Sequence, residues 1–258
     1  MEIGISVSTV EQVKAIAAQG VRRVFVGSDC KDLDRIMTKL GELDMICETL
    51  HAPFSAINDM WSEDDEKGRA ELAAQMEAID ICVRYGVGVI ITHVSSGRPM
   101  PPMNEKGFAR YDTLVAYARE KGVRIAFENL RYLENLEALM ARYPDMGFCW
   151  DTGHEYCYTP EVRYMPMFGD RTIALHVHDN ACGFDTDDHV LPFDGSIDFE
   201  TVASDLAAAN CQCTLMLEIG RGCRINDEAI YEAMSYETYY SRAVAAARRL
   251  SDMVEAKR

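Results

Sequence analysis

The chain repeats one pattern along its length: a short apolar run, a polar loop and then a longer amphipathic segment. Eight of the apolar runs are rich in Val, Ile, Leu and Phe, as strands buried on both faces are. They span residues 2–7, 22–27, 45–51, 87–94, 123–128, 146–151, 171–178 and 213–219. Strands that alternate with helices form parallel βα units. The pattern therefore favours an open doubly wound sheet or a closed barrel.

The sequence of the turn after the first strand distinguishes the doubly wound sheet from the closed barrel. A doubly wound sheet usually carries a Gly-rich phosphate turn at this point, but residues 6–10 read Ser-Val-Ser-Thr-Val. The length of 258 residues matches a barrel, which typically has about 250. Helical patterns at 66–85, 104–121 and 226–250 lie between or after the strands, and the longest irregular stretch covers 179–197. We predict an α/β fold with a single (β/α)₈ TIM-barrel domain over residues 1–258.

Composition excludes several classes of protein. No run approaches the roughly 18 apolar residues that span a membrane. Residues 1–7 have no basic region, so we expect no signal peptide and a cytoplasmic location. Nine scattered cysteines without a C-x-x-C pair indicate reduced thiols. The net charge of −16 argues against nucleic acid as a partner, because phosphate binding needs a basic surface.

Polar side chains gather at the ends of the predicted strands. All six histidines lie at or just past C-terminal strand ends, and none lies on a predicted helix: His51, His93, His154, His176, His178 and His189. Glu128, Asp151 and Glu218 end the fifth, sixth and eighth predicted strands. In a barrel these strand ends converge on one mouth, where active sites lie. The sequence therefore predicts that these side chains meet in one site.

These residue types suit a divalent metal ion. Asp151 and Asp179 also fit the N-caps of following helices, but Glu is a weak N-cap, and Glu128 and Glu218 follow apolar runs. Mixed Glu, Asp and His ligands without thiolate suit Mn²⁺, Co²⁺, Mg²⁺, Fe²⁺ or Zn²⁺. Four such ligands leave positions open for substrate oxygens, as in a catalytic site.

Short motifs occur in a fixed order from the third predicted strand to the eighth. They are His51-Ala-Pro-Phe, Ile91-Thr-His93, Phe127-Glu128-Asn129-Leu130, Asp151-Thr-Gly-His154, His176-Val-His-Asp179, Asp187-Asp-His189 with Gly195 after it, and Leu217-Glu218. At these residues the chain resembles the xylose isomerase-like barrel superfamily. That superfamily contains sugar (phosphate) isomerases and epimerases, and metal-dependent apurinic endonucleases are its relatives.

The resemblance implies roles for individual residues. It implies one divalent metal ion, for which we expect Mn²⁺, Co²⁺ or Zn²⁺, held by Glu128, Asp151, His176 and Glu218. It also implies that Glu128 and Glu218 exchange protons with a carbon of the substrate. The substrate-binding residues we predict are His51, His93, His154, His178, His189 and Arg221. A metal that chelates a carbonyl and the adjacent hydroxyl acidifies the C–H between them, which a carboxylate on each face can deprotonate and reprotonate.

Two positions differ from the family pattern. Ketose 3-epimerases carry an arginine six residues after the strand-seven ligand, where this chain has Cys182, and Arg221 is a candidate replacement or a solvent-facing loop residue. His178 is an additional histidine that shares a strand face with His176, so it either enters the mouth or hydrogen-bonds a neighbouring carboxylate.

The function we predict is a sugar isomerase or epimerase that acts on a small keto sugar or sugar acid. An inosose-type dehydratase uses the same first step, and a non-catalytic barrel subunit is a further alternative. A three-zinc apurinic endonuclease is the remaining one. Its ligand set can be traced through His93, Glu128, Asp151, His154, His176, Asp187, His189 and Glu218, but Met60 replaces its ninth ligand. Tyrosines 231, 236, 239 and 240 either mark a contact in a homo-oligomer or pack on the barrel.

Overall fold

Eight parallel strands form a ring in the computed structural model, which describes residues 1–181, 183–225 and 228–258. The strands are β1 Ile3–Ser6, β2 Arg23–Gly27, β3 Ile46–His51, β4 Val89–Thr92, β5 Arg124–Glu128, β6 Gly147–Asp151, β7 Thr172–His176 and β8 Leu215–Leu217. Their order in the sheet is β7-β6-β5-β4-β3-β2-β1-β8. A parallel bridge between Val177 and Leu217 brings the two ends of the sheet together. The predicted (β/α)₈ TIM barrel is confirmed.

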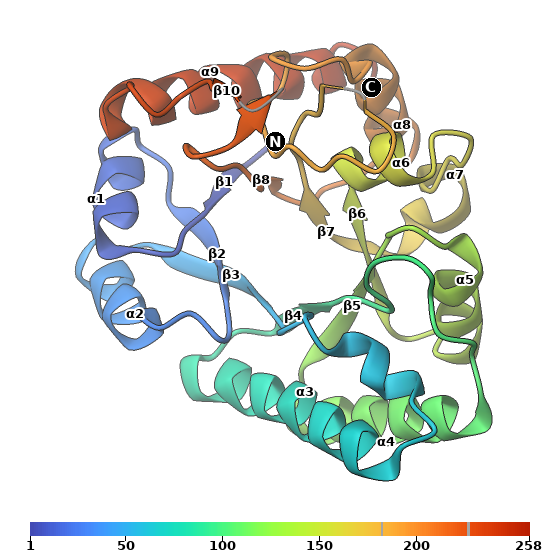
Figure 1. The fold of residues 1–258 in the computed structure, drawn as a ribbon. Helices are drawn as coiled ribbons and strands as arrows, with labels where there is room; N and C mark the ends of the chain where they lie inside the picture. Colours follow the sequence, from blue (N-terminus) through green and yellow to red (C-terminus); the bar gives the residue numbers. More distant parts are fainter. Residues whose placement is uncertain (182, 226–227) are drawn as a thin grey trace.

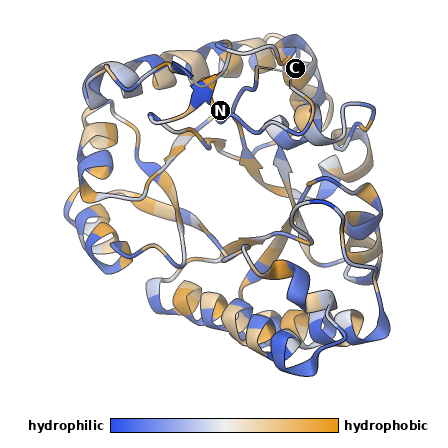
Figure 2. Cartoon of the chain, in the orientation of Figure 1, coloured by the Kyte–Doolittle hydropathy of each residue, from blue (hydrophilic) through white to orange (hydrophobic). Residues whose placement is uncertain are grey.

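Helices surround the ring of strands (Figure 1). They are α1 Val10–Ala18, α2 Leu33–Glu42, α3 Asp65–Tyr85, α4 Glu105–Lys121, α5 Leu133–Arg142, α6 Thr152–Tyr158, α7 Met165–Phe168, α8 Phe199–Ala208 and α9 Tyr236–Glu255, with 3₁₀ turns η1 Ile57–Trp61 and η2 Gly169–Arg171. The short strands β9 Arg224–Ile225 and β10 Glu228–Ala229 pair in the antiparallel direction. The helices carry apolar residues alongside polar ones, and the strands are largely apolar (Figure 2). Within the described ranges, no helix combines the length and apolar character that a membrane crossing needs.

The inside of the barrel determines where the polar strand-end residues point. Ile91, Ala126, Cys149 and Ala174, from four successive strands, form a small buried cluster separate from the main core. Side chains two positions apart on a strand share a face. Positions 93, 128, 151 and 176 follow these four residues by two, so their side chains also point to the barrel axis. The apolar interior thus ends in a layer of polar side chains at the mouth.

The helix predicted over 226–250 was wrong at its start. Helix α9 begins at Tyr236 and runs to Glu255, and Ser235 caps it by accepting a hydrogen bond from the Thr238 backbone N–H at 3.1 Å. The apolar spacing before Ser235 belongs to β10 and the turn after it. Three of the four tyrosines noted in the sequence, Tyr231, Tyr239 and Tyr240, are at most 2% exposed and pack within the chain.

The long loop predicted over 179–197 is present in its described residues, 179–181 and 183–197, and one side chain holds it in place. Asp179 does not cap a helix, contrary to the N-cap interpretation. Its carboxylate is buried and accepts backbone N–H bonds of 2.8–3.0 Å from Asn180, Phe193, Gly195 and Ile197. Four donors satisfy a buried carboxylate that would otherwise be costly. The loop is therefore a packed segment that returns on itself beside the barrel mouth.

Replacing Gly195 with alanine is expected to destabilise the fold by about 2–3 kcal/mol, since overpacking in a site that cannot relax costs this much. A β-carbon at Gly195 would lie 2.3 Å from the Asn180 carbonyl oxygen and 2.4 Å from Asp179 Oδ1. Urea unfolding measures the loss. Gly88→Ala is the control, because a β-carbon added at Gly88 would meet no atom within 4 Å. Equal stability of the two variants would contradict the packing of this loop.

Candidate metal centre

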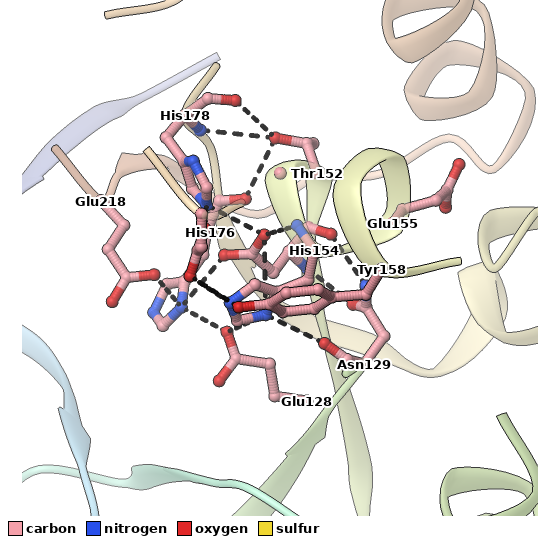
Figure 3. Close-up of polar contacts among 12 residues, drawn as sticks. Glu128, Asn129, Thr152, His154, Glu155, Tyr158, His176, His178 and Glu218 are labelled. Atoms are coloured by element: carbon pink, nitrogen blue, oxygen red, sulfur yellow. Dashed lines mark hydrogen bonds and ion pairs between the residues drawn. The ribbon is translucent and has the colours of Figure 1, made fainter. Parts of the chain in front are cut away.

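Four potential ligands converge at the barrel mouth. Glu128, Asp151 and His176 end β5, β6 and β7, and Glu218 directly follows β8. His176 Nδ1 lies 2.8 Å from Glu128 Oε1, 3.0 Å from Glu218 Oε2 and 4.0 Å from Asp151 Oδ2. The ligand atoms of all four residues lie within 4.8 Å of one another. The structure therefore brings together the four residues predicted as metal ligands, and Figure 3 shows Glu128, His176 and Glu218 turned toward one another.

The charges of this cluster favour a bound cation. Glu128, Asp151 and His176 are fully buried, and Asp151 Oδ2 has no hydrogen-bond partner. Among the described residues, no Lys or Arg forms an ion pair with Glu128, Asp151 or Glu218. Three carboxylates whose only cationic partners in the described part of the chain are histidine side chains are unfavourable in a buried site. The donor set fits one divalent metal ion bound by oxygen and imidazole ligands, with Asp151 Oδ2 free to serve as a ligand atom.

Two further histidines contact Glu128 on its second carboxylate oxygen. His51 Nε2 and His93 Nε2 lie 3.2 and 3.0 Å from Glu128 Oε2, on the carboxylate oxygen that does not face His176. Burial alone would raise the pKa of Glu128, but the His176 charge and hydrogen bonds from three imidazoles outweigh it and hold the pKa well below its usual range. Glu128 is thus held as a carboxylate in a fixed orientation.

A second polar cluster surrounds Asp187, next to the first. Asp187 Oδ2 lies 3.2 Å from His154 Nε2 and 3.1 Å from His189 Nε2, and it accepts a 3.2 Å hydrogen bond from the Tyr158 hydroxyl. Burial would lower the pKa of His154, but the charges of Asp151 and Asp187 raise it to about 10. Burial would also lower the pKa of His189, but the hydrogen bond to Asp187 and the charge of Glu218 raise it to about 10.

Backbone and side-chain hydrogen bonds fix Asp151. Its Oδ1 accepts a 2.6 Å bond from the His154 backbone N–H, so Asp151 is both a predicted ligand and the N-cap of α6. Asn129 bonds the backbone N–H and C=O of Asp151, each at 2.8 Å. His178 Nε2 lies 3.1 Å from Asp151 Oδ1, and His178 is fully buried. His178 is therefore buried beside this carboxylate, but neither of its ring nitrogens has a hydrogen-bond partner among the described residues, so the predicted hydrogen bond is not present.

An open pocket adjoins the metal centre. Its volume is about 630 Å³, and the ends of β1, β2, β3 and β8 together with the loop at 187–189 form its walls. Glu218 is the one predicted ligand on its wall, and its side chain is 22% exposed. His51 and His189 line the pocket as well. A ligand in this pocket therefore approaches the cluster from the Glu218 side.

The other residues predicted to bind substrate lie elsewhere. His93, His154 and His178 are buried behind the ligands and are not on the pocket wall. His154 also lies in the first turn of α6, although we expected no histidine on a helix; the helix begins directly at the strand end, capped by Asp151. The Arg221 guanidinium donates to the carbonyl oxygens of Glu232 and Met234, both at 2.8 Å.

The structure describes one of the two positions at which this chain lacks a residue expected from the resemblance. Met60, which stands where the endonuclease relatives have a ligand, is fully buried in η1. Cys182, where ketose 3-epimerases carry an arginine, lies outside the residues that the structure describes.

Several residues of the site were missed from the sequence. Asn129 and Thr152 position their neighbours, and Asp29 and Phe54 line the pocket. Asp29 follows β2 as closely as the histidines follow their strands, so the same strand-end rule would have found it. The side chains of Asn129 and Thr152 bond to backbone groups of Asp151 and His178, and only the fold brings these partners together.

Comparison with known sequences gives two results. Residues 10–239 match the family model described as xylose isomerase-like TIM barrel. Uncharacterized protein y4fM of Sinorhizobium fredii (strain NBRC 101917 / NGR234) is 32% identical over 196 residues. The match covers 70% of this chain and spans about 60% of the length of that curated relative.

Comparison with solved structures shows a shared fold. D-psicose 3-epimerase from Clostridium cellulolyticum H10, solved with D-tagatose, has a TM-score of 0.78 at 13% identity, covering 98% of this chain and 99% of that one. The 3-keto-D-glucoside 4-epimerase of E. coli has a TM-score of 0.72 at 15% identity, covering 96% and 99%. An L-ribulose 3-epimerase has a TM-score of 0.72 at 15% identity, covering 100% and 99%.

Proposed function

Because the chain belongs to the xylose isomerase-like TIM barrel family, we propose that it is a divalent-metal-dependent isomerase or epimerase of a keto sugar or sugar acid. One observation carries the proposal: the carboxylates of Glu128 and Glu218 approach the same imidazole nitrogen, at 2.8 and 3.0 Å, with Asp151 completing the cluster. The structural neighbours named as sugar epimerases support it.

Glu128, Asp151, His176 and Glu218 would hold the metal ion, whose positive charge would offset their three carboxylates. The ion would supply Lewis acidity toward a carbonyl and an adjacent hydroxyl oxygen. Glu218 faces the pocket, so it is placed to take or return a proton at the carbon between those oxygens. We assign the reverse transfer, on the opposite face of that carbon, to Glu128, which His51 and His93 orient.

A dehydratase is the second candidate, favoured by His189. This residue lies on the pocket wall, and its Nδ1 is 2.9 Å from the Glu218 carbonyl oxygen. An imidazolium can protonate a leaving hydroxyl, and the proton that His189 would give is the one on Nε2, which Asp187 accepts at 3.1 Å. Loss of water instead of inversion would identify this reaction.

The test is solvent exchange. Manganese-, cobalt- and zinc-loaded protein is incubated in D₂O with ketoses and hexuronic acids, and NMR follows deuterium at carbon. We expect deuterium at the carbon next to the carbonyl and a second epimer or isomer. Chelator-treated protein is the control and should show neither. Absence of exchange from every sugar, or cleavage of abasic DNA by the same preparation, would overturn the proposal in favour of a subunit or a nuclease.

A further inference from the structure

The pocket beside Glu218 is larger than one sugar ring requires. Pockets of about 300–1,000 Å³ enclose drug-sized ligands, which are larger than a hexose, and this pocket measures about 630 Å³. The reacting end, marked by Glu218 and His189, is one corner of it. The wall continues past the ends of β1 and β2 to Ser8 and Asp29. Space for a second group lies on that side.

The distance between the two ends of the pocket follows from the sheet order. Glu218 follows β8 and Asp29 follows β2, and β1 lies between these strands. Neighbouring strands are about 4.8 Å apart, so two spacings separate the strand ends by roughly 10 Å. A single ring that reacts at Glu218 does not extend over two strand spacings. A ring with a linked second ring does.

The far end of the pocket has the chemistry to bind hydroxyl groups. Asp29 is exposed on the pocket wall and forms no hydrogen bond or ion pair within residues 1–181, 183–225 and 228–258. A carboxylate accepts from two hydroxyls at once, as vicinal diols of a sugar present them. Phe54 lines the pocket past the end of β3, the strand next to β2; it is 48% exposed, and one side of its ring is stacked on His93 at 4.5 Å. An exposed aromatic face beside polar groups suits the apolar C–H face of a sugar.

We infer that the substrate is a keto sugar or sugar acid carrying a glycosidic substituent, whose second unit binds between Ser8 and Asp29. This inference rests on the proposed function, because the reacting unit is the one placed at Glu218. It adds the substrate class: a keto-disaccharide or keto-glycoside in preference to the free monosaccharide.

The test compares free and linked forms of one ketose with the metal-loaded protein. D-fructose is the free form, and isomaltulose and lactulose carry a hexose on its O6 and O4. Deuterium exchange gives kcat/KM for each, and calorimetric titration gives Kd. We expect at least one linked sugar to be preferred by about tenfold or more, the effect of a hydrogen bond to a charged group. Asp29→Ala is expected to remove most of that preference by raising KM for the linked sugar.

Glu11→Ala is the matched control, because Glu11 is an exposed carboxylate at the start of α1 that does not line the pocket. This variant should keep the native preference. Equal kcat/KM and equal Kd for free and linked sugars, unchanged by Asp29→Ala, would overturn the inference and leave the proposed function intact. Exchange from no sugar would overturn the proposed function, and equal Kd values in the same preparation would overturn the inference as well.

Discussion

Glu218→Gln is expected to lower kcat for carbon–hydrogen exchange by about 10²–10⁴-fold, the usual contribution of a positioned acid or base. Glutamine keeps an oxygen for the metal ion but cannot accept the proton. Glu218 lies on the pocket wall and 3.0 Å from His176 Nδ1, so the substitution changes the group closest to an entering ligand. The expected loss is in kcat, with a smaller change in KM.

The two-base mechanism makes a sharper prediction when the variants are compared in D₂O. With one glutamate replaced, the remaining one still removes a proton from the epimer that presents its C–H on that side. Glu218→Gln and Glu128→Gln should therefore each retain exchange from one epimer, and from opposite epimers. Deuterium NMR on both epimers measures this. Loss of exchange from both epimers in both variants would contradict separate roles for the two glutamates.

Glu48→Gln is the control for these variants. Glu48 lies in β3 but accepts hydrogen bonds from Arg23 and Thr214, at 2.9 and 2.8 Å, away from the mouth. Residues at the N-terminal face of a barrel contribute to stability and not to the reaction. This variant should lose stability but keep exchange from both epimers.

Asp151→Asn is expected to abolish the stabilisation that a divalent metal gives to the native protein. A ligand present at one hundred times its Kd adds about 2.7 kcal/mol to the free energy of unfolding. For a chain of this size that is roughly 5–10 °C in Tm. The native protein should show this rise when Mn²⁺ is added after chelation, and the variant should show little or none.

The same substitution is expected to raise the stability of the metal-free protein. Asp151 Oδ2 is buried without a hydrogen-bond partner beside Glu128 and Glu218, and we expect the relief of this repulsion to exceed the lost attraction to the His154 imidazolium. Asparagine keeps Oδ1 as the acceptor for the His154 N–H. Thermal unfolding of chelated samples checks this, with Asp80→Asn on the surface of α3 as control. A chelated variant less stable than the chelated native protein would contradict repulsion within this charge cluster.

The strand-end histidines and carboxylates show how much the sequence reveals. The period of apolar runs predicts eight strands, and a barrel collects their C-terminal ends, so Glu128, Asp151, His176 and Glu218 could be placed together from the sequence alone. Alternation along each strand then explains why they point inward. These rules need only the spacing of apolar residues along the chain and the assumption of a barrel fold.

The sequence could not predict which of these side chains line the pocket and which are buried against the predicted metal ligands. His51 and His93 both contact Glu128, yet His51 lines the pocket while Phe54 stacks on His93. Arg221 turns away to two carbonyl groups of the following loop. Such differences depend on side-chain packing and on loop paths, which residue spacing does not encode. The start of α9 was misplaced for a related reason, because β10 and the turn after it have an apolar spacing that resembles that of a helix over a few residues.

The most direct test of the central claim is the metal content of protein purified without chelator or added metal, with Asp151→Asn measured alongside. We predict close to one manganese, cobalt or zinc per chain in the native protein and a large fall in the variant. A content close to three zinc ions per chain, or none even after divalent metals are added back, would contradict a single metal ion held by Glu128, Asp151, His176 and Glu218.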